Sequence, residues 1–172
     1  MATKPSTTTD TDNLYVLRAW ALPAGETSVD RDALFYDHYE GAYADYSEQF
    51  GLFQLSAYLR DPDPMSAART LIDDMERRLA IRVIELDHDL VTADDITHRV
   101  RPAALPVLEG LTDARGCDGF PAPLGRLRGG LAVWEWAPVN TWLRHHGFGD
   151  PETPLTHDQI TDINTWLTTR ST

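Results

Sequence analysis

A pair of glycines between two short β-type runs constrains this chain more than any other feature of its sequence. The runs Leu124–Arg128 and Leu131–Trp136 flank Gly129-Gly130. Glycine reaches positive φ without steric cost, so this pattern predicts a tight β-hairpin. Pro138 then suits the first turn of a helix, where its missing N–H is not needed. Residues at helical spacing then follow: Val139, Trp142, Leu143 and His146.

The same stretch carries a family resemblance. It reads FPAP at 120–123, then a hairpin with arginines and glycines, then WEWAPVNTWL at 134–143. This pattern is similar to the distal half of winged helix-turn-helix proteins of the MerR and excisionase type. It most resembles the small helix-turn-helix DNA-binding regulators common in actinobacteria. The resemblance implies a winged helix-turn-helix over residues 90–149 whose partner is double-stranded DNA, with the hairpin as its wing.

Two helices should precede the wing if the resemblance holds. Thr92 can cap a helix over 93–100, with Asp95 three residues later in a capping box. By position, residues 103–115 would form the recognition helix. Family members usually place polar residues early in that helix, where side chains reach base edges. This chain departs from the pattern, because those places hold Ala103, Ala104 and Pro106, which offer no polar side chain to a base edge.

Five arginines are the candidate DNA contacts. Arg126 and Arg128 alternate along one run of the hairpin, so a strand there would point both to one face, where they could straddle a phosphate backbone. The alternative is a pair of solvated arginines. Arg99, Arg101 and Arg115 of the helix-turn-helix region would extend the same basic patch.

The charge distribution leaves two functions open. The net charge is −12, and residues 1–93 hold 17 acidic against 8 basic residues. Residues 94–149 hold 6 of each sign, so the half that resembles a DNA-binding module is neutral, whereas DNA binders usually present a basic face. We therefore expect a non-enzymatic DNA-binding regulator. The alternative is a protein-interaction adaptor that kept a winged fold and lost its DNA contacts.

The N-terminal half predicts a ferredoxin-like α/β sandwich over residues 13–89, after a disordered lead-in over 1–12. Strands are expected at 14–22, 53–60 and 81–86 from their content of β-forming and alternating apolar residues. A first helix should start at Asp30 or Asp32 and run to about Tyr46. Asp63 and Pro64 form a strong start for a second helix. The fold class is therefore α+β, and the acidic first half would serve as a scaffold, as a dimerisation domain or as the binding surface for a protein partner.

The chain closes with a predicted helix over about 157–170. A capping box, Thr156-His-Asp-Gln159, opens it. Its apolar stripe consists of Ile160, Ile163, Trp166 and Leu167. We expect residues 150–172 to pack on the winged domain, with pairing to a second copy in a homodimer as the alternative.

Other polar groups suggest no catalytic, metal or cofactor site. Asp87-His88-Asp89 could supply metal ligands or an acid–base group, but charged linkers are common between domains. His145-His146 stands at a helix end, where adjacent residues do not face each other. Cys117 has no flanking signature of a nucleophile. The sequence contains no P-loop, dinucleotide fingerprint, zinc spacing or hydrolase elbow.

Cysteine use and hydropathy bear on location. The single cysteine excludes an internal disulfide and fits a reducing compartment. No apolar run approaches the length of a membrane span. The expected location is therefore the cytoplasm, in association with the nucleoid if the protein binds DNA, with no membrane partner.

Overall fold

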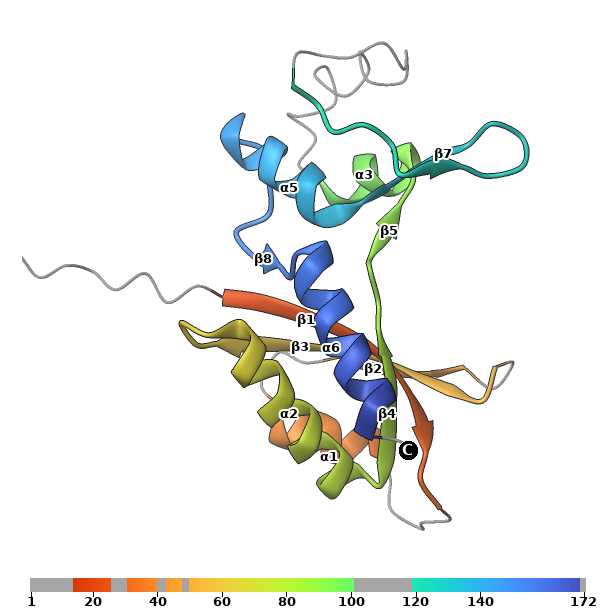
Figure 1. Cartoon of the computed structure of the whole chain (residues 1–172), viewed down its shortest axis with the longest axis vertical. Coiled ribbons are helices and arrows are strands. Elements are labelled where there is room, and N and C mark those ends of the chain that lie inside the picture. The colour runs from red at the N-terminus through yellow and green to blue at the C-terminus, as the bar shows by residue number, and fades with distance from the viewer. Residues whose placement is uncertain (1–13, 26–30, 40–42, 48–49, 101–118, 171–172) are drawn as a thin grey trace, which may run out of the picture.

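The computed structural model describes residues 14–25, 31–39, 43–47, 50–100 and 119–170. The expected α+β composition is confirmed: helices and strands occur in both halves of the chain. The described residues form two hydrophobic cores. Figure 1 shows the elements around them as a lower part with a long sheet and a smaller upper part. The predicted lead-in over 1–12 lies outside the described residues.

The first sheet contains four antiparallel strands in the order β2-β3-β1-β4. They are β1 (Leu14–Pro23), β2 (Tyr43–Ser47), β3 (Leu52–Arg60) and β4 (Ile81–Leu86). β4 pairs only with the second half of β1. The remaining edge of β1 is taken by β8 (Thr153–Pro154), which returns from the other end of the chain and pairs in parallel with Tyr15 and Val16.

One face of this sheet is covered by three helices. Alternate residues of β1 and β3 are buried, so each strand has a core side and an outer side. Their partners come from α1 (Arg31–His38), α2 (Pro64–Leu79) and α6 (His157–Arg170). We call the sheet with these three helices the first unit. Among its fully buried side chains are Leu17, Phe35, Leu55, Ile72, Met75, Ile163 and Leu167.

The predicted start of α2 is confirmed. Asp63 is the N-cap, and its carboxylate accepts hydrogen bonds from the backbone N–H groups of Met65 and Ser66 at 3.1 and 3.3 Å. Pro64 opens the helix. The helix ends at Ala80, which takes a left-handed conformation with φ 49° and so turns the chain directly into β4.

The first helix is shorter than predicted. α1 ends at His38, and Tyr43–Ser47 is a strand instead of helix. Pairing with β3 decides this, because Tyr43–Ser47 lies antiparallel to Leu52–Ser56 with every residue in register. A hairpin partner a few residues away outweighs weak helical propensity.

The C-terminal helix packs on the first unit, so the prediction that it packs on the winged domain is wrong. The buried residues of α6, Ile160, Ile163 and Leu167, belong to the same core as the first sheet. Asn164 fixes α6 to β4, because its side chain accepts from Leu86 N at 2.6 Å and donates to Leu86 O at 3.1 Å. An amphipathic stripe predicts that a helix packs, but not on which core.

A second, smaller core lies above the first sheet. It joins β5 (Leu90–Val91), α3 (Ala93–Arg99), β6 (Gly125–Arg126), β7 (Ala132–Glu135) and α5 (Trp136–His145). The strands form a separate sheet in the order β5-β7-β6. We call this assembly the second unit. Its buried residues are Val91, Ile96, Val100, Trp134, Trp136, Val139, Trp142 and Leu143.

Candidate nucleic-acid interface

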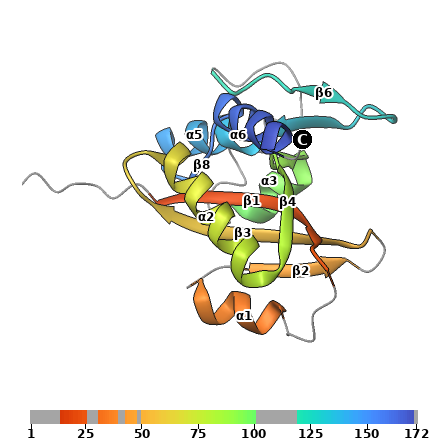
Figure 2. The same cartoon turned by 60° about the horizontal axis from the view of Figure 1, so that its bottom comes forward.

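The β6–β7 hairpin extends outward from the rest of the second unit in both Figure 1 and Figure 2. Its turn is centred on Arg128 and Gly129, because the N–H of Gly130 donates to the carbonyl of Leu127 at 3.0 Å. Gly129 and Gly130 have φ values of 95° and 84°, as a turn that needs glycine demands. β6 ends at Arg126, so Arg128 lies in the turn, and the strand alternation expected for the two arginines does not apply.

Both hairpin arginines are exposed to solvent. The Nη1 of Arg126 donates to the carbonyl of Gly130 at 2.9 Å, which holds the side chain along the turn. Within the described part of the chain, neither Arg126 nor Arg128 forms an ion pair with a carboxylate. The turn therefore presents two positive charges that the described acidic side chains do not neutralise.

Apolar side chains share this hairpin with the arginines. Leu124, Leu127 and Leu131 are 62%, 58% and 48% exposed. Exposed leucines are ordinary when scattered, but three within eight residues form a small apolar surface. The hairpin thus combines charge with apolar contact area.

Aromatic rings fix the base of the hairpin. Phe120 packs edge-on against Trp134 and Trp142, with ring centroids 6.1 and 5.1 Å apart. The indole N–H of Trp134 donates to the carbonyl of Pro121 at 3.0 Å. The FPAP segment and the two tryptophans, which were conspicuous in the sequence, therefore form one packed cluster beneath the hairpin.

The helix predicted over 93–100 is present as α3. Its capping box is complete: Asp95 N donates to Thr92 Oγ1 at 3.3 Å, and the Asp95 carboxylate accepts from Thr92 N at 2.8 Å. The hydrogen bonds from Thr92 lower the pKa of Asp95. The predicted recognition helix over 103–115 lies outside the described residues, as do Arg101, Arg115 and Cys117.

Arg99 is occupied by contacts within the protein. Its guanidinium donates two hydrogen bonds of 2.7 Å to the two carboxylate oxygens of Asp89 and lies 5.0 Å from the ring centre of Trp136. Burial lowers the pKa of Arg99. A bidentate, partly desolvated pair of this kind has a fixed geometry, so we assign Arg99 to holding the two units together.

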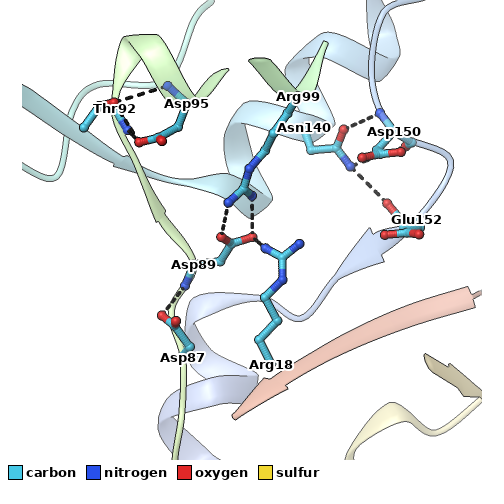
Figure 3. Close-up of polar contacts among 9 residues, drawn as sticks. All are labelled: Arg18, Asp87, Asp89, Thr92, Asp95, Arg99, Asn140, Asp150 and Glu152. Carbon is cyan, nitrogen blue, oxygen red and sulfur yellow. Dashed lines mark hydrogen bonds and ion pairs between the residues drawn. The ribbon is translucent and has the colours of Figure 1, made fainter. Parts of the chain in front are cut away.

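Asp89 links the two units. Figure 3 shows it between Arg99 of α3 and Arg18 of β1, which also pairs with its carboxylate. Burial, and next the charge of Arg99, lower the pKa of Arg18. Asp89 has φ 50° and its N–H donates to Asp87 at 2.9 Å, so the turn places its carboxylate between the two arginines. Sequence reasoning missed Arg18, whose only signal was a charge inside the apolar run of β1.

A buried asparagine fixes the return to the first unit. Asn140 is fully buried on α5. Its side chain accepts from the N–H of Asp150 at 2.7 Å and donates to the carbonyl of Glu152 at 3.0 Å (Figure 3). These bonds shape the segment that leads to β8, and an apolar residue at 140 would leave buried backbone groups unpaired.

The histidines considered in the sequence have different environments. His145 and His146 each bond a carbonyl of their own helix, and His146 stacks on Trp142 at 3.9 Å between ring centres. His88 instead lies beside Glu135 and His157. The sequence offers no spacing motif for this group, because its members are separated by dozens of residues.

Comparison with protein-family models, with curated proteins and with solved structures found no match. The helices in the described part of the chain include none with the length and apolar character needed to cross a bilayer.

Proposed function

We propose that this protein is a DNA-binding regulator whose residues 90–149 form a winged helix-turn-helix. The observation that carries the proposal is the β6–β7 hairpin, which is exposed and carries two arginines without carboxylate partners among the described residues. In a chain of net charge −12, a projecting structure with unneutralised positive charge is a surface suited to phosphate.

The architecture of the second unit supports this reading. A capped helix, α3, precedes the hairpin, and α5 follows it and supplies tryptophans that pack against the hairpin base. A wing needs such a support, because a hairpin that is attached at one end can contact the DNA backbone only if its direction is fixed. In the proposal, the segment 103–115 enters the major groove, and Arg126 and Arg128 contact phosphates beside it.

For the first unit we propose a ferredoxin-like sandwich that acts as a scaffold or dimerisation domain. The element order β1-α1-β2-β3-α2-β4 and the strand order β2-β3-β1-β4 agree with that arrangement. Two copies would place two wings on one duplex, and the second contact would then be effectively intramolecular. The proposal places the protein in the cytoplasm, at the nucleoid.

The wing can be tested by a titration with random-sequence duplex DNA at several salt concentrations. We expect the double variant Arg126→Ala/Arg128→Ala to lose affinity by about a hundredfold, because each arginine contributes a charged hydrogen bond to phosphate worth about 1.5 kcal/mol or more. The slope of log K against log salt should decrease in magnitude by about 2, one for each lost phosphate contact.

A matched control removes the same charge from the first unit. Arg60 and Arg82 are exposed arginines on β3 and β4, and Arg60→Ala/Arg82→Ala should leave the affinity and the salt slope unchanged. If both double variants bind DNA as the parent does, the hairpin has no role in DNA binding.

A second function is favoured by the apolar surface of the hairpin. The exposed leucines at 124, 127 and 131 would suit a protein partner, so the alternative is an adaptor that uses a winged fold without DNA. Absence of duplex binding by the parent protein in low salt would favour this adaptor.

A further inference from the structure

Three side chains from separate parts of the chain converge at the junction of the two units. His88 lies in the linker between β4 and β5, Glu135 ends β7, and His157 opens α6. Their ligand atoms all lie within 4.8 Å of one another. We call this group the His88–Glu135–His157 cluster.

Both imidazoles are directed at one carboxylate oxygen. The Nδ1 atoms of His88 and His157 lie 3.1 and 2.6 Å from Oε1 of Glu135. The two rings are 4.9 Å apart, centre to centre. If both rings were protonated, two positive charges would share one negative charge at this short separation. Three ligand atoms that converge in this way can instead coordinate a single cation placed between them.

The dimensions fit a zinc-type ion. Bonds of about 2.0–2.1 Å to histidine nitrogen and to a carboxylate oxygen place tetrahedral ligand atoms about 3.3 Å apart. The two measured separations are shorter than this, so small side-chain movements would open the cluster to the required size. Two histidines and one glutamate are also a ligand set that zinc uses when its fourth position stays open.

The positions of the three side chains leave them available as ligands. Glu135 is the N-cap residue of α5, yet its side chain makes no capping hydrogen bond. Thr156 and Gln159 cap α6 through hydrogen bonds to each other, so the imidazole of His157 is not needed to cap the helix. The side chain of Glu135 is 13% exposed and that of His157 is 55% exposed. The carboxylate is therefore largely buried, while an ion could reach the cluster from the solvent beside His157.

We propose that His88, Glu135 and His157 bind a divalent cation of the zinc class, with solvent in the fourth position. The bound ion would join the linker after β4, the hairpin-bearing β7 and the first turn of α6. These elements belong to both units, so the ion would stiffen the connection between the first sheet and the second unit. This inference does not depend on DNA binding, and its test uses no nucleic acid.

The test is a titration of tag-free full-length protein with Zn²⁺ by calorimetry, checked by competition with a chromophoric chelator. We expect one ion per chain. His88→Ala, Glu135→Gln and His157→Ala should each weaken binding at least about tenfold, since even indirect partners of a metal ligand change affinity by about 10–100-fold. Zn²⁺ should also raise the thermal midpoint of the parent protein but not of the variants.

Two control variants keep the proposal open to refutation. His145→Ala removes an exposed histidine whose Nδ1 bonds the carbonyl of Thr141 in its own helix, and Cys117→Ser removes the single thiol of the sequence. Both should bind Zn²⁺ as the parent does. Circular dichroism of each variant shows whether it is folded. If an alanine variant does not fold, Glu135→Gln still tests the site, because it preserves the side-chain volume. Absence of binding by the parent, or binding that depends on Cys117 or His145 but not on the cluster, overturns the proposal.

Discussion

At the scale of single residues, hydrogen bonds from Thr92 distinguish two adjacent acidic side chains in the first turn of α3. Asp95 is exposed, yet it closes the capping box of α3 with Thr92. Asp94, next to it, is also exposed and takes part in no cap. The two carboxylates therefore form a matched pair in the same helical turn, and hydrogen bonds from Thr92 lower the pKa of Asp95.

Replacement of Asp95 by asparagine should lower stability in a pH-dependent way. The lowered pKa in the folded state means that Asp95 contributes its stabilisation above its ordinary pKa of about 3.9 and loses it as pH falls through the lower folded value. We expect Asp95→Asn to cost about 0.5–1 kcal/mol at pH 7, the net contribution of one hydrogen bond, and less near pH 3. Urea unfolding at both pH values measures this difference.

The neighbouring residue provides the control for that measurement. Asp94→Asn changes the same charge in the same turn and should show a smaller cost at pH 7, because no cap depends on it. Equal costs for the two variants at both pH values would mean that the capping bonds of Asp95 add nothing to stability.

At the scale of elements, the junction of α2 with β4 is the tightest connection in the first unit. Ala80 alone separates the helix from the strand and takes the left-handed conformation. For residues with a Cβ this conformation costs about 1–2 kcal/mol. The helix end is thus strained, and the strain is held by the packing of α2 and β4 on one core.

Ala80→Gly should therefore stabilise the protein. Relief of the left-handed strain exceeds the extra chain entropy of glycine in the unfolded state, which is about 0.4–1 kcal/mol, so we expect a net gain of about 0.5–1 kcal/mol. Thermal and urea unfolding give the change. Ala67→Gly, the same substitution inside α2, should instead destabilise by about 1 kcal/mol. A loss of stability in both variants would contradict the expected strain at residue 80.

The elements also show how far sequence reasoning reaches. The start of α2 was predictable, because a cap and a proline act within one turn. The strand at Tyr43–Ser47 was not, because its partner β3 decides its conformation. The core that α6 joins could not be predicted either, since an apolar stripe does not specify which core a helix packs on. The His88–Glu135–His157 cluster needs three elements to meet, and no local pattern in the sequence encodes that meeting.

At the scale of the whole molecule, the two cores meet at a small polar junction. Asp89 pairs with Arg18 of the first unit and with Arg99 of the second. Its side chain is 15% exposed, and those of the two arginines are 28% and 30% exposed. Loss of the carboxylate would leave two like charges partly buried and facing each other.

Asp89→Asn should loosen this junction. Asparagine tolerates the left-handed backbone at this position, so the variant removes charge without adding strain. We expect a loss of about 1–3 kcal/mol, below the cost of breaking a fully buried pair. Hydrogen exchange should speed up in α3 and in the first half of β1. Asp73→Asn, which breaks the more exposed pair with Arg170, should cost at most about 1 kcal/mol. Unchanged exchange in Asp89→Asn would show that the units are held by other contacts.

The return of the chain through β8 makes the second unit an insertion. The segment that carries the hairpin leaves the first unit after β4 and comes back at Thr153, beside the first strand. The last helix then completes the core that the first strand began. The two units are therefore not consecutive along the chain. The first unit is discontinuous in sequence, and a fragment that stops before Leu155 would lack part of the hydrophobic core of that unit. The second unit could be replaced by another module between the end of β4 and the start of β8. Truncation from the C-terminal end would instead remove α6 and so damage the first unit.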